Sequence, residues 1–256
     1  MAARLPNYYS RLEPFQEAFV SGNPILTYHK LGPRPRGVRL KGLYVGAALF
    51  RKQLRELRAA GFANGSLDAC VSQPAGKRIV ITFDDGYASV LRHGMEVLRE
   101  QGFRAVLFVV ADYIGRSNVW DEAEGEVAEL LMDEPQLRDW LGAGHEIGAH
   151  TCTHPALTKI SPAQAREEIV AGKKKLEDRF GAPVRHFCYP YGDWNPAVLD
   201  LVREAGYQTA STTAAGMNHP GESPLLLKRF TARYESRSLK NMLGRARNFL
   251  RPGKAG

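Results

Sequence analysis

The sequence has 256 residues, of which 44% are hydrophobic and 24% are charged, so it is long enough for one large globular domain with a buried core. No stretch approaches the roughly 20 apolar residues that cross a bilayer, no secretory signal begins the chain, and three cysteines without a CxxC pair suit a reducing compartment, so we expect a cytoplasmic protein. The net charge of +8 is spread along the chain without any nucleic-acid-binding motif, so no nucleic acid is expected as a partner.

Short apolar runs alternate with amphipathic stretches along the chain. The amphipathic stretches space their apolar residues by three and four and end in glycine, as helices do, and Ser161-Pro162 and Asn195-Pro196 are typical helix starts. The apolar runs predict strands at 25–28, 78–83, 105–110, 145–147, 186–189, 208–211 and 225–230. Strands that alternate with helices predict parallel βαβ units, in either an open sheet or a barrel.

We predict three parts of the chain. Residues 1–21 form an N-terminal extension, residues 22–235 form the catalytic domain, and residues 236–256 form a basic helix and tail. The tail is weakly amphipathic and is expected to pack against the body, with peripheral contact to an acidic membrane surface as the alternative.

The first chemical motif is Thr82-Phe83-Asp84-Asp85-Gly86, where two acids follow an apolar strand. Sites in parallel α/β folds are built at the carboxyl ends of strands, and neighbouring residues there point in different directions. Asp84 and Asp85 can therefore do different work. The alternative is that one of them only caps the following helix.

The second motif is His150-Thr151-Cys152-Thr153-His154-Pro155, in which two imidazoles four residues apart can face one point. Two histidines and one carboxylate are a common ligand set for a catalytic metal with an open position for water. His145, just ahead of this pair, is interpreted as structural or as a residue that orients a ligand.

The third motif is Cys188-Tyr189-Pro190-Tyr191-Gly192, again at the end of a predicted strand. These residues either form a simple turn or wall a pocket and present a backbone N–H toward a reacting oxygen. Together the three motifs resemble the polysaccharide deacetylases, carbohydrate esterase family four, whose shared core is the NodB homology domain. The segment PILTYHK at 24–30 is similar to the start of the poly-N-acetylglucosamine deacetylase branch.

The resemblance implies a distorted (β/α) barrel of about seven parallel strands that binds a divalent metal. Zn²⁺ is the expected metal, with Ni²⁺, Co²⁺, Fe²⁺ and Mn²⁺ as alternatives. Asp85, His150 and His154 would be the metal ligands, Asp84 the general base, and Tyr191 the donor of an oxyanion-hole N–H.

Two positions depart from the family pattern. Many members have an arginine that pairs with the base where this chain has Cys188, so either another cation orients Asp84 or the base works without a charged partner. The usual C-terminal histidine that acts as general acid is also missing. The N-terminal segment makes His29 our candidate acid, with His219 as the alternative. Trp194 and Pro190 are predicted to contact substrate, and Trp120 is a second candidate for stacking on a sugar.

We therefore predict hydrolytic N-deacetylation of an N-acetylated sugar, either a poly- or oligosaccharide or a carrier-linked aminosugar. One alternative is an amidohydrolase that acts on a non-carbohydrate amide, cyclic imide or ureide with the same scaffold. The other is a carbohydrate-binding protein that has lost catalysis. The expected partner is the N-acetylated carbohydrate substrate.

Overall fold

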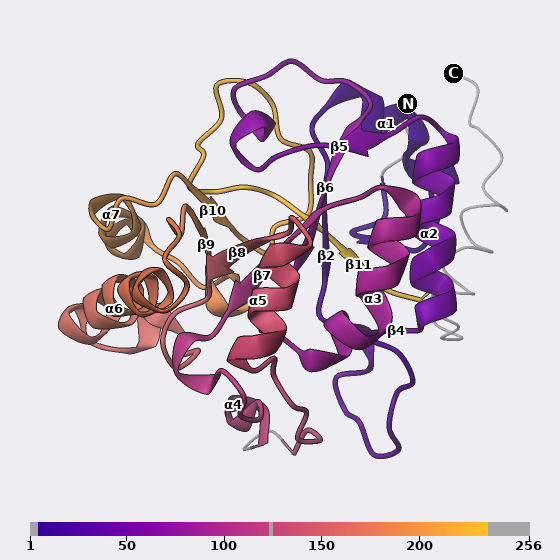
Figure 1. The fold of residues 1–256 in the computed structure, drawn as a ribbon. Helices are drawn as coiled ribbons and strands as arrows, with labels where there is room; N and C mark the ends of the chain where they lie inside the picture. Colours follow the sequence, from indigo (N-terminus) through magenta and orange to yellow (C-terminus); the bar gives the residue numbers. More distant parts are fainter. Residues whose placement is uncertain (1–4, 123–124, 235–256) are drawn as a thin grey trace, which may run out of the picture.

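A large parallel sheet forms the centre of the molecule, and the computed structural model describes it over residues 5–122 and 125–234. Its nine strands are β1 (Tyr8–Tyr9), β2 (Ile25–Tyr28), β5 (Ala63–Asn64), β6 (Arg78–Phe83), β7 (Ala105–Val109), β8 (Glu146–Ala149), β9 (His186–Cys188), β10 (Thr209–Ser211) and β11 (Phe230–Ala232). They follow the order β1-β11-β2-β6-β7-β8-β9-β10, with β5 attached to β6, and every pair is parallel. The sheet curves into a distorted barrel (Figure 1). Its end strands β1 and β10 do not pair with each other in the described part of the chain, so the barrel is open there.

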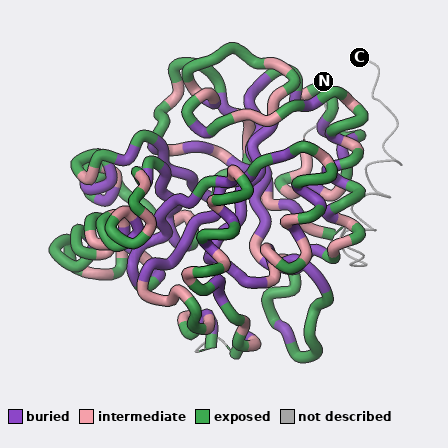
Figure 2. Tube along the Cα trace, in the orientation of Figure 1, coloured by how far each residue is buried: buried purple, intermediate pink, exposed green. Residues whose placement is uncertain are grey.

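Helices cover the outside of this sheet (Figure 1). The α-helices are α1 (Gln16–Ser21), α2 (Ala47–Ala59), α3 (Ala88–Gln101), α4 (Val119–Glu122), α5 (Glu134–Gly142), α6 (Pro162–Phe180) and α7 (Pro196–Glu204). Short 3-10 helices span Glu13–Phe15, Lys41–Leu43, Asp68–Cys70, Ala111–Tyr113, Leu157–Lys159 and Pro190–Gly192. Helices α2 and α3 pack together, as do α6 and α7. The central strands β6 and β7 are buried (Figure 2). The predicted fold class is confirmed.

The predicted helix starts and ends follow from local capping. The Ser161 hydroxyl accepts the Gln164 N–H and the Gln164 side chain accepts the Ser161 N–H, which closes a capping box at the start of α6. Asn195 Oδ1 accepts the Val198 N–H in the same way at α7. Gly181 ends α6 with a φ of 65°, a conformation that glycine adopts without steric cost.

The strand predictions fail at one apolar run that is not a strand and at strands of only two residues. The strand predicted at 225–230 is wrong, because β11 begins only at Phe230. Leu227 is buried beside β10 and exchanges backbone hydrogen bonds with Ala210 and Thr212, but this contact is an isolated bridge. β1 and β5 and the separate parallel pair β3 (Lys30–Leu31) and β4 (Tyr44–Val45) have two residues each, which is too few for a periodic signal.

The register brings the ends of neighbouring strands to one edge. Tyr28 of β2 pairs with Phe83 of β6, and Val109 of β7 pairs with Ala149 of β8. The residues that follow these strands include His29, Asp84 and His150, so two motif residues and the candidate acid lie at the carboxyl edge of the sheet. This is the edge at which parallel α/β proteins build their sites.

The residues before β2 contribute to the core. β1 pairs with β11, and Phe15 and Phe19 pack against Phe230 with ring centroids 5.2 and 5.9 Å away. The predicted domain boundary at residue 22 stays a prediction, and the predicted basic tail at 236–256 lies outside the described residues. Within the described residues, no helix combines the length and apolarity that a membrane crossing requires.

His145 lies at the opposite, amino-terminal edge of the sheet, immediately before β8. Its ring stacks on Trp140 with centroids 4.1 Å apart, and its Nδ1 accepts the Ala105 N–H at 3.2 Å. Burial, helped by the charge of Arg104, lowers the pKa of His145 from 6.5 to about 4. His145 therefore supports the packing of α5 against the sheet as a neutral ring.

A neutral buried His145 makes stability depend on pH. Because its pKa is lower in the folded chain than in the unfolded chain, its contribution is present above pH 6.5 and is lost as the pH falls toward 4. We expect this group to account for about 1–2 kcal/mol of the stability lost between pH 7 and pH 4.5, after allowance for solvent screening. Urea denaturation of wild type and His145→Gln at both pH values measures this loss, and equal pH dependence in the two proteins would contradict it.

Candidate active site

The first motif forms a tight turn between β6 and α3. Asp84 and Asp85 are 3% and 4% exposed, and Asp85 and Gly86 have φ values of 72° and 84°. Neither carboxylate caps α3, whose N-cap residue Tyr87 makes no side-chain capping bond. The turn sends the two side chains in different directions, so that Asp85 faces the histidines of the second motif and Asp84 faces Arg229.

Asp85, His150 and His154 converge on one point. Asp85 Oδ1 lies 3.3 Å from His150 Nε2 and 3.4 Å from His154 Nε2, and the three donor atoms lie within 4.8 Å of one another. Ligands about 2.1 Å from a tetrahedral Zn²⁺ are themselves about 3.4 Å apart, so the spacing suits such an ion. The donor set of one carboxylate and two imidazoles therefore fits a divalent metal.

The hydrogen bonds of His150 favour the same conclusion. Its Nδ1 lies 2.7 Å from the Cys188 carbonyl oxygen, and a carbonyl can only accept, so Nδ1 carries the proton. In the neutral form of the ring, the Nε2 lone pair would be free to bind an ion beside Asp85, as in metal sites where a second hydrogen bond fixes the ligand. In the protein alone, burial disfavours the charged ring, but Cys188 and Asp85 outweigh burial and raise the pKa of His150. A rival set of Asp84, His150 and Cys188 also lies close together, but Arg229 donates to both Asp84 and Cys188 and would repel a cation there.

The cation that pairs with Asp84 is Arg229, which sequence reasoning missed. Its Nη1 and Nη2 donate to the two Asp84 oxygens at 2.7 and 2.8 Å, and its Nε donates to the Thr212 carbonyl at 2.9 Å. Arg229 is 2% exposed, and its guanidinium lies 3.2 Å from Cys188 Sγ. Cys188 thus occupies the motif position at which many family members have an arginine. Here Arg229, from the segment before β11, supplies the positive charge instead.

This arginine controls the ionisation of Asp84. Burial alone would raise the pKa of Asp84, but the charge and hydrogen bonds of Arg229 outweigh burial and hold the pKa below its ordinary value. Asp84 is therefore a carboxylate at neutral pH, fixed in orientation by two parallel hydrogen bonds.

His29 and His219 lie at opposite edges of the sheet. His29 follows β2, lines the same cavity as Asp84, and places Nε2 3.8 Å from Asp84 Oδ2. Its Nδ1 is buried and has no hydrogen-bond partner in the described structure. His219 is exposed beside Gly22, at the amino end of β2. Of the two candidates for the general acid, His29 alone lies near the acids.

The third motif contributes Tyr191 to the cavity wall, with its ring 4.7 Å from that of His154. Pro190 is buried and Trp194 is 39% exposed, and neither is among the described residues that line the cavity. The tryptophan that does line it is Trp120, which stacks on His154 at 4.6 Å. The predicted substrate contacts of Pro190 and Trp194 stay predictions.

Backbone strain is concentrated in the three motifs. In the described part of the chain, four residues other than glycine have positive φ values: Asp85 at 72°, Thr151 at 65°, His154 at 67° and Tyr191 at 58°. Each belongs to a motif. Such conformations cost about 1–3 kcal/mol each and persist where the surroundings fix them, as at functional sites.

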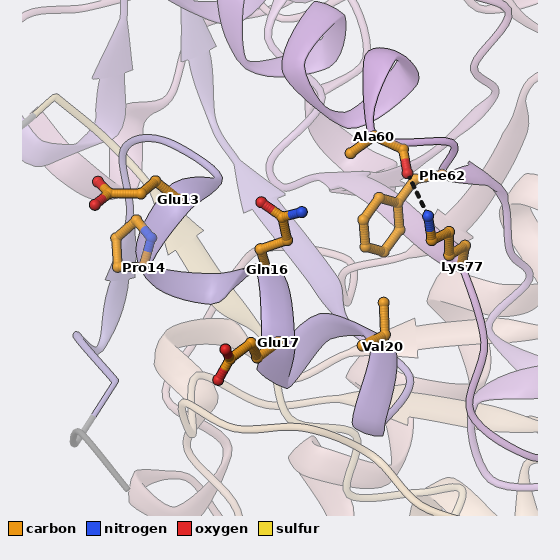
Figure 3. Close-up of a pocket in the computed structure, with 8 residues that line it drawn as sticks. All are labelled: Glu13, Pro14, Gln16, Glu17, Val20, Ala60, Phe62 and Lys77. Atoms are coloured by element: carbon orange, nitrogen blue, oxygen red, sulfur yellow. Dashed lines mark hydrogen bonds between the residues drawn. The ribbon is translucent and has the colours of Figure 1, made fainter.

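The motif residues surround a cavity of about 270 Å³ at the carboxyl edge of the sheet. A larger hollow of about 660 Å³ lies near the amino edge, between the N-terminal segment and Lys77 (Figure 3). Glu13 and Glu17 point away from Lys77 in this hollow, and Lys77 donates to the Ala60 carbonyl. Its lining includes no motif residue, so the smaller cavity is the candidate active site.

The buried carboxylate–imidazole cluster at the carboxyl edge of the barrel could hold a metal ion, and comparison with known proteins gives the family. The sequence model of the polysaccharide deacetylases matches residues 72–210, more than half of the chain, and this chain belongs to that family. The chain is 32% identical to a chitooligosaccharide deacetylase of Azorhizobium caulinodans over 136 residues, which cover 52% of this chain and 57% of the relative. It spans about half the length of the curated relatives it matches.

Solved structures share the fold. The Streptococcus pyogenes deacetylase PplD, solved with acetate, superimposes with a TM-score of 0.70 over 86% of this chain and 96% of that chain, at 23% identity. IcaB from Ammonifex degensii superimposes with a TM-score of 0.70 over 85% of this chain and 93% of that chain, at 24% identity. At this level of identity the likeness establishes the barrel.

The Arg229–Asp84 pair generates a stability prediction. Arg229→Met leaves the Asp84 carboxylate buried without a partner, which typically costs about 3–5 kcal/mol, and we expect a loss of this size in urea denaturation. Arg229→Lys keeps the charge without the two parallel bonds and should lose less.

Arg166→Met is the matched control, because it breaks an ion pair with Glu204 whose side chains are 54% exposed. Exposed pairs contribute about 0–1 kcal/mol, so this variant should stay near wild type. Equal losses in Arg229→Met and Arg166→Met would show that the buried pair has no special role.

Proposed function

We propose that this chain is a metal-dependent deacetylase that hydrolyses the N-acetyl amide of a sugar. The observation that carries the proposal is the convergence of Asp85, His150 and His154 on one point, with Asp84 beside them in the same cavity. Family membership supports deacetylation as the reaction, and the donor set supports the need for a divalent ion.

Asp85, His150 and His154 would hold the ion through Oδ1 and the two Nε2 atoms. Zn²⁺ suits these donors best, and a bound divalent ion supplies Lewis acidity that polarises an amide carbonyl and acidifies a water molecule. The hydrogen bond from His150 Nδ1 to the Cys188 carbonyl keeps that ring in the ligating orientation.

Asp84 would act as the general base. Arg229 keeps it ionised and oriented, which also makes it a weak base, so it needs a water molecule that is already more acidic than bulk water. Asp84 takes one proton from this water as the water oxygen bonds to the carbonyl carbon. The fixed carboxylate then remains close to the reacting atoms.

His29 would act as the general acid, and the Tyr191 N–H would stabilise the carbonyl oxygen as it gains negative charge. His29 lines the cavity beside Asp84. When the C–N bond breaks, His29 gives a proton to the departing nitrogen, which leaves as an amine, while the acyl group leaves as acetate. Water is thereby added across one amide bond.

Two features support a carbohydrate substrate. The similar protein of Azorhizobium caulinodans is named a chitooligosaccharide deacetylase. The cavity of about 270 Å³ is near the lower end of the range for small-molecule pockets, about 300–1,000 Å³, so it suits one sugar ring at a time. Acetate release from N-acetylated sugars, from monomers to chito-oligomers, compared with turnover of allantoin-like rings, separates this proposal from a ureide hydrolase.

The general base and the metal ligands should have separable roles. We expect Asp84→Asn to reduce acetate release by about 10²–10⁴-fold with metal content unchanged, since it removes a general base. His154→Ala should lose both bound metal and activity, because it removes a ligand. Metal analysis of the purified variants together with acetate assays tests both, and an active Asp84→Asn enzyme would remove Asp84 from this role.

The acid should be separable from the ligands. His29→Ala is expected to lower kcat by about 10²–10⁴-fold while metal content stays at the wild-type level. His219→Ala is the matched control, because it removes a histidine from the far edge of the sheet. If kcat instead falls in His219→Ala and not in His29→Ala, the acid has been assigned to the wrong histidine.

A further inference from the structure

The segment between β7 and α5 forms a wall of the cavity that the three motifs do not provide. Trp120 and Asp121, both in α4, line this cavity. Trp120 is held on two sides, since its ring stacks on His154 at 4.6 Å and meets the edge of Tyr113 at 5.3 Å. Asp121 follows directly and is 6% exposed.

The two carboxylate oxygens of Asp121 are in different situations. Oδ2 accepts hydrogen bonds from Asn118 Nδ2 at 2.9 Å and from the Tyr87 hydroxyl at 3.3 Å. Oδ1 accepts none from any residue in the described ranges. Asp121 lines the cavity, and a carboxylate oxygen that has no partner within the protein can accept a hydrogen bond from a ligand there.

A buried lysine, Lys30, interacts electrostatically with this carboxylate. Lys30 is 1% exposed, and its Nζ lies 4.6 Å from the centre of the Tyr87 ring and 4.9 Å from that of Tyr44. The Tyr44 hydroxyl in turn donates to Glu129 at 2.9 Å. Burial lowers the pKa of Lys30, and Asp121 and Glu129 are the largest influences that oppose this. The Lys30 ammonium therefore lies close enough to the carboxylates of Asp121 and Glu129 to interact with both.

The loop after β3 completes the wall with apolar side chains. Glu126 accepts the backbone N–H groups of Arg39 and Leu40 at 3.1 and 2.5 Å, which links this loop to the segment that follows α4. Leu40 and Leu43 line the cavity together with Asp121. The wall therefore combines an apolar surface with one hydrogen-bond acceptor, a pairing that matches the C–H face and the hydroxyl edge of a pyranose ring.

We propose that Asp121 is a specificity-determining residue whose Oδ1 accepts a hydrogen bond from a hydroxyl group of the sugar ring in the cavity. This inference rests on the proposed function, because it concerns the ring that carries the acetyl group. Asp121 binds that ring and takes no part in the proton transfers assigned to Asp84 and His29.

Asp121→Asn tests this with little change in shape. The donors on Asn118 and Tyr87 will hold the new amide oxygen where Oδ2 was, so the NH₂ group replaces Oδ1 at the cavity. The cavity then presents a donor where it presented an acceptor. We expect kcat/KM for N-acetylated chito-oligosaccharides to fall by about 10–100-fold, as for loss of a hydrogen bond to a charged group, with bound metal and Tm near wild type.

Monodeoxy analogues of the same substrate identify the hydroxyl group. With the analogue that lacks the contacted hydroxyl group, kcat/KM of the wild type should fall by about as much as the Asp121→Asn substitution lowers kcat/KM for the full substrate. In the Asp121→Asn variant, this analogue should have nearly the same kcat/KM as the full substrate. A defect in folding of the loop would instead lower turnover of all analogues alike. Glu122→Gln is the matched control, because it removes the same charge from the next, exposed residue and should stay within about two-fold of wild type.

Wild-type kinetics in Asp121→Asn with the full substrate would overturn the inference and leave the proposed function intact. Additive losses with every deoxy analogue would also overturn it, because Asp121 would then contact no ring hydroxyl. Failure of the wild-type, metal-loaded protein to release acetate from any N-acetylated sugar is a different result. It would count against the proposed function, and with it against a sugar-binding role for Asp121.

Discussion

The bidentate pair between Arg229 and Asp84 is the interaction on which the interior of the barrel depends. The guanidinium group contacts Asp84 after β6, the Thr212 carbonyl after β10 and Cys188 Sγ at the end of β9. Arg229 itself precedes β11, so its contacts connect strands near opposite ends of the sheet. A buried guanidinium requires a charged partner, and Asp84 is that partner. The two parallel hydrogen bonds hold the carboxylate in one orientation and keep it ionised.

Two adjacent buried carboxylates would repel each other if they shared one environment. The positive φ at Asp85 separates them, and each has its own partners: Arg229 for Asp84, and the imidazoles of His150 and His154 for Asp85. The strained backbone at Asp85 therefore allows two neighbouring acids to have different environments. The same turn keeps both acids off the start of α3, although acids are favoured there.

Sequence reasoning could identify what is local and could not identify what depends on distant contacts. Apolar runs predict the parallel strand–helix units and the longer strands, and three short motifs identify Asp84, Asp85 and the two histidines. The barrel itself is implied by the resemblance of these motifs to the family, since the pattern alone allows an open sheet as well. Arg229 was not predicted, because its side chain crosses the interior from the segment just before β11, far along the chain from Asp84. A lone arginine in the apolar run LLLKRF was the available signal. Asp121 was missed because its role depends on the Tyr87 and Asn118 donors that orient it.

The groups around the cavity come from unequal parts of the chain. The segment that matches the family model, residues 72–210, contains both acids and both imidazoles of the cluster. His29 precedes this segment and Arg229 follows it, and the parallel sheet brings them together because β2 lies between β11 and β6. Residues 72–210 alone would contain the proposed metal ligands but neither His29, the proposed proton donor, nor Arg229, the counter-charge of Asp84. The proposed chemistry therefore needs both flanking parts of the chain.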